Sequence, residues 1–194
     1  MDIILLNSKN AEKYLTQISE LHKEAYSKEH FTASFSIKML CEYYQLLIYY
    51  SDISLVAADG LSVVGFLISG VNVRKGVSAF TRKNWVYICA KLLIRPSQLI
   101  EKIMIWIAVR LHIKKKFETA YRLVSLAVRS DTKSKGIAAQ LIGSLESMLL
   151  LLKISNYGIS VRKNNMRAIN FYKKLNFVQE DEFHNALYFS KSIE

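Results

Sequence analysis

Residues 126–139, LAVRSDTKSKGIAA, constrain the fold of this chain more than any other stretch. An apolar run ends in a basic, glycine-bearing loop, and the loop leads directly into a segment with helical apolar periodicity. The first turn of a helix leaves backbone N–H groups without intrahelical partners and carries partial positive charge. Gly136 lets a ligand approach the backbone closely, and Lys133 and Lys135 add full charges beside the amides. The stretch therefore predicts a strand, a pyrophosphate-binding loop and a helix.

A second motif, NMRAINFYKKLNF at residues 165–177, follows after a β-rich run at residues 157–161. The basic loop resembles the acyl-CoA loop of the GNAT acetyltransferase superfamily, Gln/Arg-x-x-Gly-x-Gly/Ala, with lysine in the leading position and Ser134 where many members have glycine. The second motif is similar to that family's Asn-x-x-Ala-x-x-Phe-Tyr-x-x-x-Gly-Phe. Asn176 replaces the usual glycine, and we expect the helix to end there normally because Asn tolerates the left-handed conformation.

The remaining pattern is that of a mixed α/β chain. Apolar periodicity predicts helices at residues 11–26 and 36–50, and Asp59-Gly60 predicts a hairpin between strands 53–58 and 61–69. The last third predicts strands and helices at residues 121–129, 136–152, 157–161, 166–175, 177–183 and 185–191. The resemblance implies an α/β (α+β) GNAT fold, with a mixed central sheet splayed at the cofactor site and helices on both faces. With 194 residues and no linker-like segment, we expect one domain, residues 1–194.

Positive charge is concentrated in one segment. Residues 74–122 hold 12 lysines and arginines and only two acidic residues, so nearly all of the net charge of +11 lies there. We interpret about 78–116 as a helical insertion before the cofactor strand, and neither of its apolar stretches, 85–94 and 99–113, is long enough to span a bilayer. Three alternatives remain: helices packed on the sheet, a basic wall facing an anionic acceptor, or an amphipathic pair on an anionic membrane surface.

Cysteines and the N-terminus bear on location. Cys41 and Cys89 lie in apolar contexts without metal-ligand spacing, so we expect reduced core residues and no metal. The first ten residues lack the basic leader and cleavage site of a secretory signal, which favours the cytoplasm, with contact to the inner face of the membrane as an alternative. No nucleic-acid-binding module accompanies the basic charge, so we expect no nucleic-acid partner.

The resemblance implies acetyl-CoA, or another short acyl-CoA, as the cofactor. In this family the strand before the loop pairs with pantetheine, the loop amides hold the pyrophosphate, and the second motif approaches the sulfur. Carried over to this chain, these positions are Leu126, Ala127, Val128, Lys133, Ser134, Lys135, Gly136, Ile137, Ala138, Asn165 and Tyr172.

Two groups are candidates for proton transfer. Tyr172 is the candidate general acid for the leaving thiolate, and the alternative is a purely packing tyrosine. The glutamate that some family members place four residues before the acetyl-contacting position is here Arg122, so that assignment fails. The remaining candidate bases are His30, Glu29 and His184, of which His30 has the most suitable ordinary pKa and also the simple alternative of a surface histidine. No base is needed if the acceptor amine has a low pKa.

We therefore expect an N-acetyltransferase that acts on a primary amine. The basic insertion and the aromatic residues between positions 30 and 50 favour a nucleotide-linked amino sugar of surface-polysaccharide biosynthesis. The alternatives are a GNAT enzyme acting on a protein, a peptide or another small-molecule amine, and an acyl-CoA-binding module without turnover. We expect a monomer or a homodimer, and a homodimer could form by pairing of the exposed edges of the final strands.

Overall fold

A computed structural model describes residues 1–26, 30–94, 100, 119–130 and 136–193. Its strands are β1 (Asp2–Leu5), β2 (Ile53–Asp59), β3 (Ser62–Gly70), β4 (Arg122–Val128), β5 (Asn156–Arg162), β6 (Val178–Phe183) and β7 (Ala186–Ser192). Its α-helices are α1 (Glu12–Ala25), α2 (Ile37–Tyr50), α3 (Val73–Lys83), α4 (Trp85–Leu93), α6 (Ile137–Leu151) and α7 (Met166–Lys174), and a 3-10 helix covers Phe31–Ser34.

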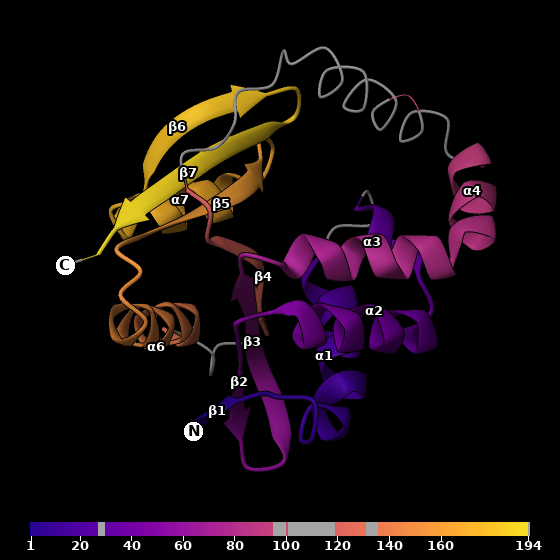
Figure 1. Ribbon diagram of the computed structural model, residues 1–194, viewed down its shortest axis with the longest axis horizontal. Coiled ribbons are helices and arrows are strands. Elements are labelled where there is room, and N and C mark those ends of the chain that lie inside the picture. The colour runs from indigo at the N-terminus through magenta and orange to yellow at the C-terminus, as the bar shows by residue number, and fades with distance from the viewer. Residues whose placement is uncertain (27–29, 95–99, 101–118, 131–135, 194) are drawn as a thin grey trace.

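The strands form one mixed sheet in the order β1-β2-β3-β4-β5-β7-β6. Neighbouring strands are antiparallel except β4 and β5, which are parallel. Helices cover both faces, with α1 and α2 against one face and α6 against the other (Figure 1). The predicted GNAT-type α/β fold is therefore confirmed.

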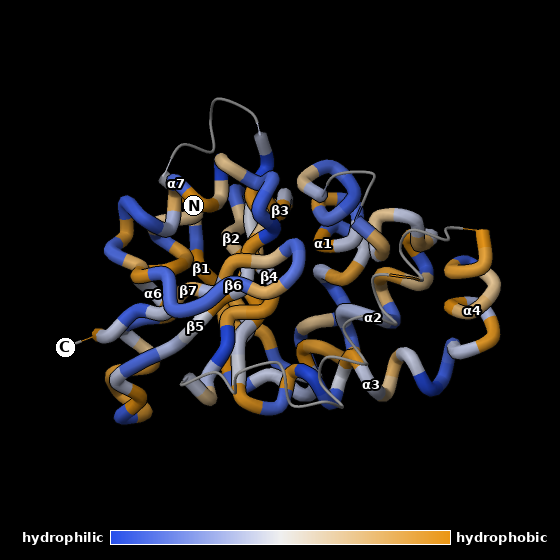
Figure 2. Tube along the Cα trace, turned by 90° about the horizontal axis from the view of Figure 1, so that it is seen from above, coloured by the Kyte–Doolittle hydropathy of each residue, from blue (hydrophilic) through white to orange (hydrophobic). Residues whose placement is uncertain are grey.

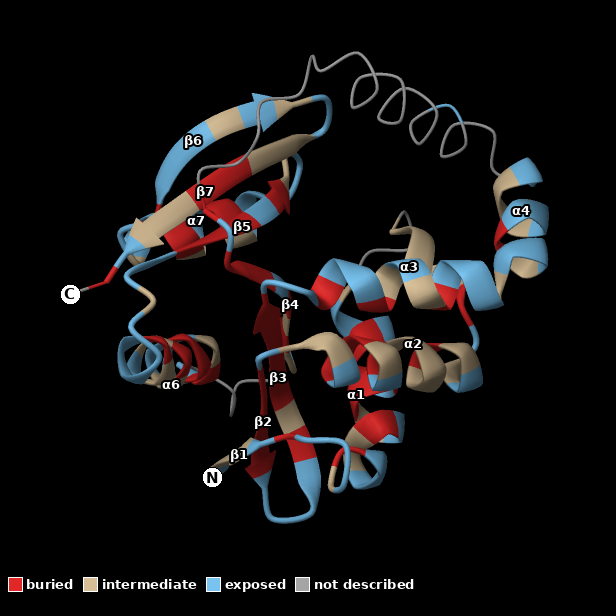
Figure 3. Ribbon diagram, viewed as in Figure 1, coloured by how far each residue is buried: buried red, intermediate tan, exposed pale blue. Residues whose placement is uncertain are grey.

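The centre of the sheet is buried because β2 and β3 are apolar on both faces. Six consecutive residues of β2, starting at Ile53, are buried, and Figure 3 shows the two strands coloured mostly as buried between the helical layers. Side chains of β3 alternate between two cores: Phe66 packs with α1 and α2, whereas Leu67 packs with α6. A continuous apolar run thus becomes a central strand with helices on either side.

Most predicted elements of the sheet and its helices have the expected bounds to within one residue. Two details differ. The first is that residues 2–5 form an edge strand, β1, paired with β2, which the short apolar run at the N-terminus did not predict. The second is the hairpin tip: Asp59 pairs with Ser62, so Gly60 and Leu61 make the turn, because a bulge between Ala57 and Ala58 shifts the register.

The sheet splays apart between β4 and β5. Only two residue pairs join these strands, Arg122 with Gly158 and Leu123 with Ile159. On its other side, β4 shifts register against β3 next to Ser69, so Val124 has no paired residue there. The register shift lies where β4 separates from β5, so the sheet opens beside the strand that was predicted to bind the cofactor.

The insertion is helical where the structure describes it, and this part packs mainly on α2 rather than on the sheet. It begins earlier than predicted, at Val73, and α3 packs on α2, where Gly76 approaches the backbone of Leu46 so closely that a Cβ would clash. In α4 only Ile88 is buried, and the helix carries a largely apolar surface at one edge of the molecule (Figure 2). The stretch at residues 99–113 lies almost wholly outside the described residues.

One prediction about this insertion is wrong. Cys89 is exposed rather than buried, because Ile88 is the one residue of α4 that is buried in the core formed by the described residues; Cys41, on α2, is half-buried against that core. Both thiols are free. Among the described residues, no helix combines the length and the apolar character required to cross a membrane.

Candidate active site

A cleft of about 660 Å³ occupies the space between the splayed strands. Its walls come from residues 123–126 of β4, residues 159–162 of β5, the start of α7, and the end of α1 with the loop after it. Segments far apart in the sequence therefore meet at the point where β4 and β5 separate.

The β4 wall offers an open strand edge. From Val124 to Val128, no described residue of β5 pairs with β4, so backbone groups on that side can bind an extended ligand. Of the residues predicted to hold pantetheine, Leu126 lines the cleft, Ala127 is buried against α1 and α2, and Val128 packs toward α6. The backbone edge, rather than the three side chains, is thus the feature that fits pantetheine.

The N-terminus of α6 fits the predicted pyrophosphate site. Gly136 stands at the N-cap with φ +88°, and a Cβ there would meet no atom within 4 Å, so the approach to the helix end is open. Among the described residues no side chain caps this end, and its first turn has no acidic residue, so the amides of Ile137 and Ala138 are available to an anion. Lys133, Ser134 and Lys135 lie outside the described residues.

Asn165 and Tyr172 both line the cleft, from the beginning and the middle of α7. The Asn165 side chain caps the helix by accepting a hydrogen bond from the Ala168 amide at 3.1 Å. Burial and the neighbouring Tyr26 raise the pKa of the Tyr172 phenol, so it stays protonated at neutral pH. No described residue hydrogen-bonds the Tyr172 hydroxyl, although the ring packs against Phe171 and Phe177.

The candidate bases are separated by the fold. His30 lines the cleft, and its Nδ1 lies 2.7 Å from Thr32 Oγ1. His184 is at the exposed turn between β6 and β7, with φ +51°, and does not line the cleft. Glu29 lies outside the described residues.

Arg122, which stands where a family base was sought, is a buried cation that ties the two strands together at the splay. Its guanidinium donates hydrogen bonds to Thr119 Oγ1 at 3.2 Å and to Ser160 Oγ at 3.0 Å. Gly158 leaves room for this side chain, since a Cβ there would collide with it. Burial, with Arg74 nearby, lowers the pKa of Arg122 to about 10, so the group remains charged at neutral pH and cannot accept a proton.

Sequence reasoning missed two polar residues that line the cleft, Tyr26 and Ser125. Tyr26, half-buried just after α1, lies with its hydroxyl 2.9 Å from Ser125 Oγ, and burial of the phenol raises its pKa. Tyr26 also stacks on His22, with ring centroids 4.1 Å apart. Ser125 had a signal in the sequence, because it is a hydroxyl within an apolar strand; Tyr26 had none, because only the fold brings α1 to β4.

Together, a strand edge, an uncapped helix N-terminus and a phenol in one cleft define a site for an extended ligand with an anionic end, of the kind found in enzymes that transfer acyl groups from coenzyme A. The model of the acetyltransferase (GNAT) family matches residues 15–177. The chain belongs to this family, and it is an acetyl-CoA-dependent N-acetyltransferase.

Solved structures share the fold at low sequence identity. The PaiA N-acetyltransferase of Thermoplasma acidophilum, solved with coenzyme A, is 15% identical with a TM-score of 0.59, and the match covers 100% of both chains. An aminoglycoside 6'-acetyltransferase type Ii is 14% identical with a TM-score of 0.64, covering 99% of this chain and 97% of the other. Naa50 of Arabidopsis thaliana, in complex with the bisubstrate analogue CoA-Ac-MVNAL, is 18% identical with a TM-score of 0.56 and full coverage of both chains.

Comparison with curated proteins finds no significant sequence match. Within the part of the chain that the structure describes, no group of three or more His, Cys, Asp or Glu side chains could hold a metal ion.

Proposed function

We propose that this enzyme acetylates the primary amine of a small, anionic acceptor, and that the acceptor is a nucleotide-linked amino sugar. The observation that carries the proposal is a second cleft of about 430 Å³, which shares Leu123, Val124 and Ser160 with the first and is lined by Arg74 and Arg122. Two guanidinium groups beside a transfer site favour a phosphate or carboxylate on the acceptor.

The donor is assigned to the first cleft. Acetyl-CoA supplies the acetyl group as a thioester. The open edge of β4 would bind pantetheine, and the amides of Ile137 and Ala138 at the start of α6 would bind the pyrophosphate. Binding both reactants along one strand would orient the amine toward the thioester, which accounts for a large part of the rate in such transfers.

Tyr172 is assigned as the general acid. Its phenol stays protonated at neutral pH and lines the cleft, so it can donate its proton to the thiolate as the C–S bond breaks. His30 is assigned as the base that removes the proton from the acceptor's ammonium group, because it lines the same cleft and has the only side-chain type with an ordinary pKa near neutrality.

The experiment described below also tests other classes of acceptor. The solved relatives include, by name, an aminoglycoside acetyltransferase and a complex with a peptide bisubstrate analogue. A polyamine or a basic protein tail fits less well, because arginines would face a cationic substrate. We further propose that the enzyme acts in the cytoplasm, where acetyl-CoA is available.

The experiment is release of free thiol from acetyl-CoA in the presence of purified enzyme and one amine at a time. The panel comprises dTDP- and UDP-linked amino sugars, the same sugars without the nucleotide, an aminoglycoside, spermidine, and peptides with free N-termini. Turnover on a nucleotide sugar that falls at least about 10-fold for the free sugar supports the proposal. Faster turnover on a peptide or on spermidine would overturn it, and tight CoA binding without turnover on any amine would indicate a binding module.

A further inference from the structure

A continuous chain of hydrogen bonds runs beneath the cleft from His30 to Ser125. His30 Nδ1 lies 2.7 Å from Thr32 Oγ1, which lies 2.9 Å from His22 Nε2. His22 Nδ1 lies 2.6 Å from the Tyr44 hydroxyl, and that hydroxyl lies 3.4 Å from Ser125 Oγ. The two ends, His30 and Ser125, line the same cleft, while His22 and Tyr44 are buried between α1 and α2.

His22 is held neutral. It is 2% exposed, and burial, with His30 and Lys23 nearby, lowers its pKa to about 3. A neutral imidazole has one N–H donor and one acceptor nitrogen, so His22 can donate to only one of its two hydroxyl neighbours and must accept from the other. The chain therefore has a direction, and every member of it must follow the same direction.

Thr32 permits two directions. Its hydroxyl has one proton, which it donates either to His22 Nε2 or to His30 Nδ1. If Thr32 donates to His30, Nδ1 must be an acceptor, and this hydrogen bond breaks when His30 is protonated. If Thr32 donates to His22, Nδ1–H of His30 donates to Thr32 in both protonation states, so the neutral and the protonated ring keep the same bonds.

From this asymmetry we propose that His22, Thr32 and Tyr44 are positioning residues that hold neutral His30 as its Nδ1–H tautomer, with Nε2 as the basic nitrogen. The inference rests on the proposed role of His30 as base. In that step the N–H bond of the acceptor's ammonium breaks, its electron pair stays on the amine nitrogen, and the proton bonds to Nε2. The chain would need no rearrangement during this step, which lowers the cost of charging the ring.

The groups around the chain come from four segments. Lys23 and Tyr26 flank His22 on its own helix, with Tyr26 stacked on the ring of His22 and edge-on to that of His30. Tyr44 faces His22 from α2, Thr32 and His30 face it from the segment after α1, and Ser125 closes the chain from β4. Of the described groups around His22, His30 and Lys23 are those whose charge acts on it, and both lower its pKa.

The direct test is nitrogen-15 NMR of the histidine side chains in the enzyme alone. We expect the Nδ1–H tautomer for both His22 and His30 at neutral pH, and a His22 that stays neutral at pH 5. T32V removes the hydroxyl at nearly constant volume and should release His30 from this tautomer, whereas T32S should retain it. An Nε2–H tautomer for His30 in the wild type, or the same His30 tautomer in T32V, would overturn the proposal.

A kinetic test uses the amine acetylated by the wild type. We expect T32V to lower kcat about 10-fold at pH 7 with little change in KM, and to approach the wild type at a pH above the amine's own pKa, where no base is needed. T32S should restore the profile. Y121F, which removes another buried phenol hydroxyl, paired with Ser69 at 3.1 Å, is the control and should leave the pH profile unchanged. A loss in T32V that is equal at all pH values would contradict a positioning role.

The two proposals fail separately. If no amine is acetylated but both tautomers are as expected, the proposed function fails and the positioning chain stands. If turnover is found and the tautomers differ, the chain is wrong and the function stands.

Discussion

At the scale of single residues, Tyr172 provides the simplest test of catalysis. Because its ring packs in the core and no described residue bonds its hydroxyl, Y172F should fold normally and retain its affinity for CoA. We expect kcat to fall about 10- to 100-fold, the range for loss of one general acid. Steady-state kinetics and CoA titration are the measurements, with Y121F as the matched loss of a buried phenol. Unchanged kcat in Y172F would leave only the packing role.

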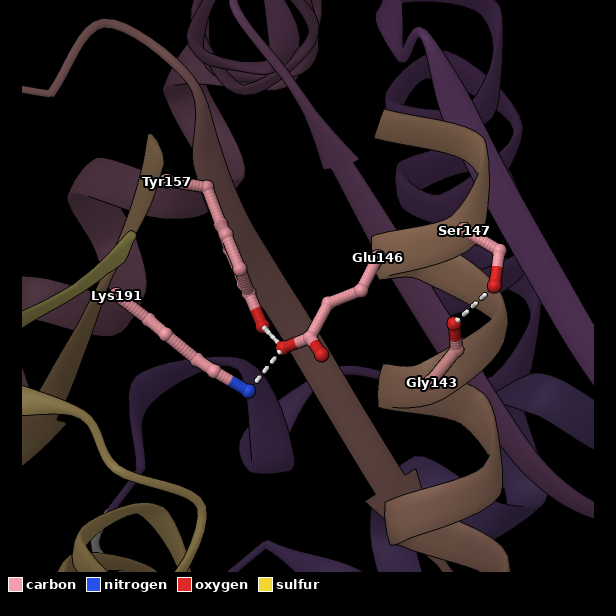
Figure 4. A network of polar contacts seen from close by, with 5 residues as sticks. All are labelled: Gly143, Glu146, Ser147, Tyr157 and Lys191. Carbon is pink, nitrogen blue, oxygen red and sulfur yellow. Dashed lines mark hydrogen bonds and ion pairs between the residues drawn. The ribbon is translucent and has the colours of Figure 1, made fainter. Parts of the chain in front are cut away.

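Glu146 stabilises the side of the sheet away from the cleft. Its Oε1 accepts hydrogen bonds from the Tyr157 hydroxyl at 2.6 Å and from Lys191 Nζ at 2.7 Å, so one carboxylate joins α6, β5 and β7 (Figure 4). We expect E146Q to lower the free energy of unfolding by about 1 to 2 kcal/mol, because it leaves a half-buried lysine without its counter-charge. Urea unfolding measures this loss, and kcat should not change.

The control for Glu146 is a more exposed ion pair. Glu182 lies 3.5 Å from Lys163 with 62% of its side chain exposed, so E182Q should change the free energy of unfolding by less than about 0.5 kcal/mol. Equal losses in the two variants would show that burial does not strengthen the Glu146 network.

At the scale of elements, the start of α6 can be tested with two glycines of similar geometry. Gly136 and Gly60 both have positive φ, and neither has an atom within 4 Å of a built Cβ. Each change to alanine should cost about 1 kcal/mol of backbone strain. Only G136A should weaken CoA binding, by about 3- to 10-fold, because its strain alters the amides of the helix end. Calorimetric titration with CoA measures the difference, and equal affinities would remove this helix end from the site.

Asn165 caps α7, a structural role that the motif, which implies cofactor binding, did not predict. Loss of its cap in N165A should lower the free energy of unfolding by about 1 kcal/mol, and N165S, which can cap equally well, should restore it. Thermal unfolding measures both variants. We also expect N165A to lower kcat, since Tyr172 lies on the helix that Asn165 caps. Full stability of N165A would mean that the cap does not hold α7.

At the scale of the whole molecule, burial of neutral His22 makes the enzyme sensitive to acid. The pKa of His22 is about 3 in the folded state and about 6.5 in the unfolded state, so only the unfolded state binds a proton between these values. Stability is therefore lost as the pH falls below about 6.5, at up to about 1.4 kcal/mol per pH unit.

Urea midpoints at pH 7, 5.5 and 4.5 test this dependence. The H22Q variant should show a shallower decline than the wild type, because it lacks the group that the unfolded state protonates. H184N keeps a residue that tolerates positive φ at the exposed hairpin and should decline as the wild type does. A wild-type slope matched by H22Q would show that other groups govern acid unfolding.

The local elements and the residues proposed for the donor site were predictable from the sequence. Apolar periodicity located most helices and strands to within a residue, but not β1 or α3, because the burial pattern of a segment depends mainly on its own side chains. The two motifs predicted Gly136, Asn165 and Tyr172, because each depends on a short, local geometry: a positive φ, a helix cap and a position on one helix. Asn176, with φ +63°, confirms the expected left-handed helix end.

Other features depended on contacts that only the tertiary structure decides. Nothing in the residues of β4 themselves shows that this strand separates from β5 after two residue pairs, or that the Arg122 side chain passes over Gly158. In the same way, the residues of α4 do not show that Cys89 is exposed. The chain from His30 through His22 to Ser125 joins residues about 100 positions apart, and its partners are chosen by the packing of α1 and α2 on the sheet. The sequence by itself determined most of the elements and the residues proposed for the donor site, since both follow from neighbouring residues. The fold decided which side chains lie within hydrogen-bond distance of His30, the proposed base.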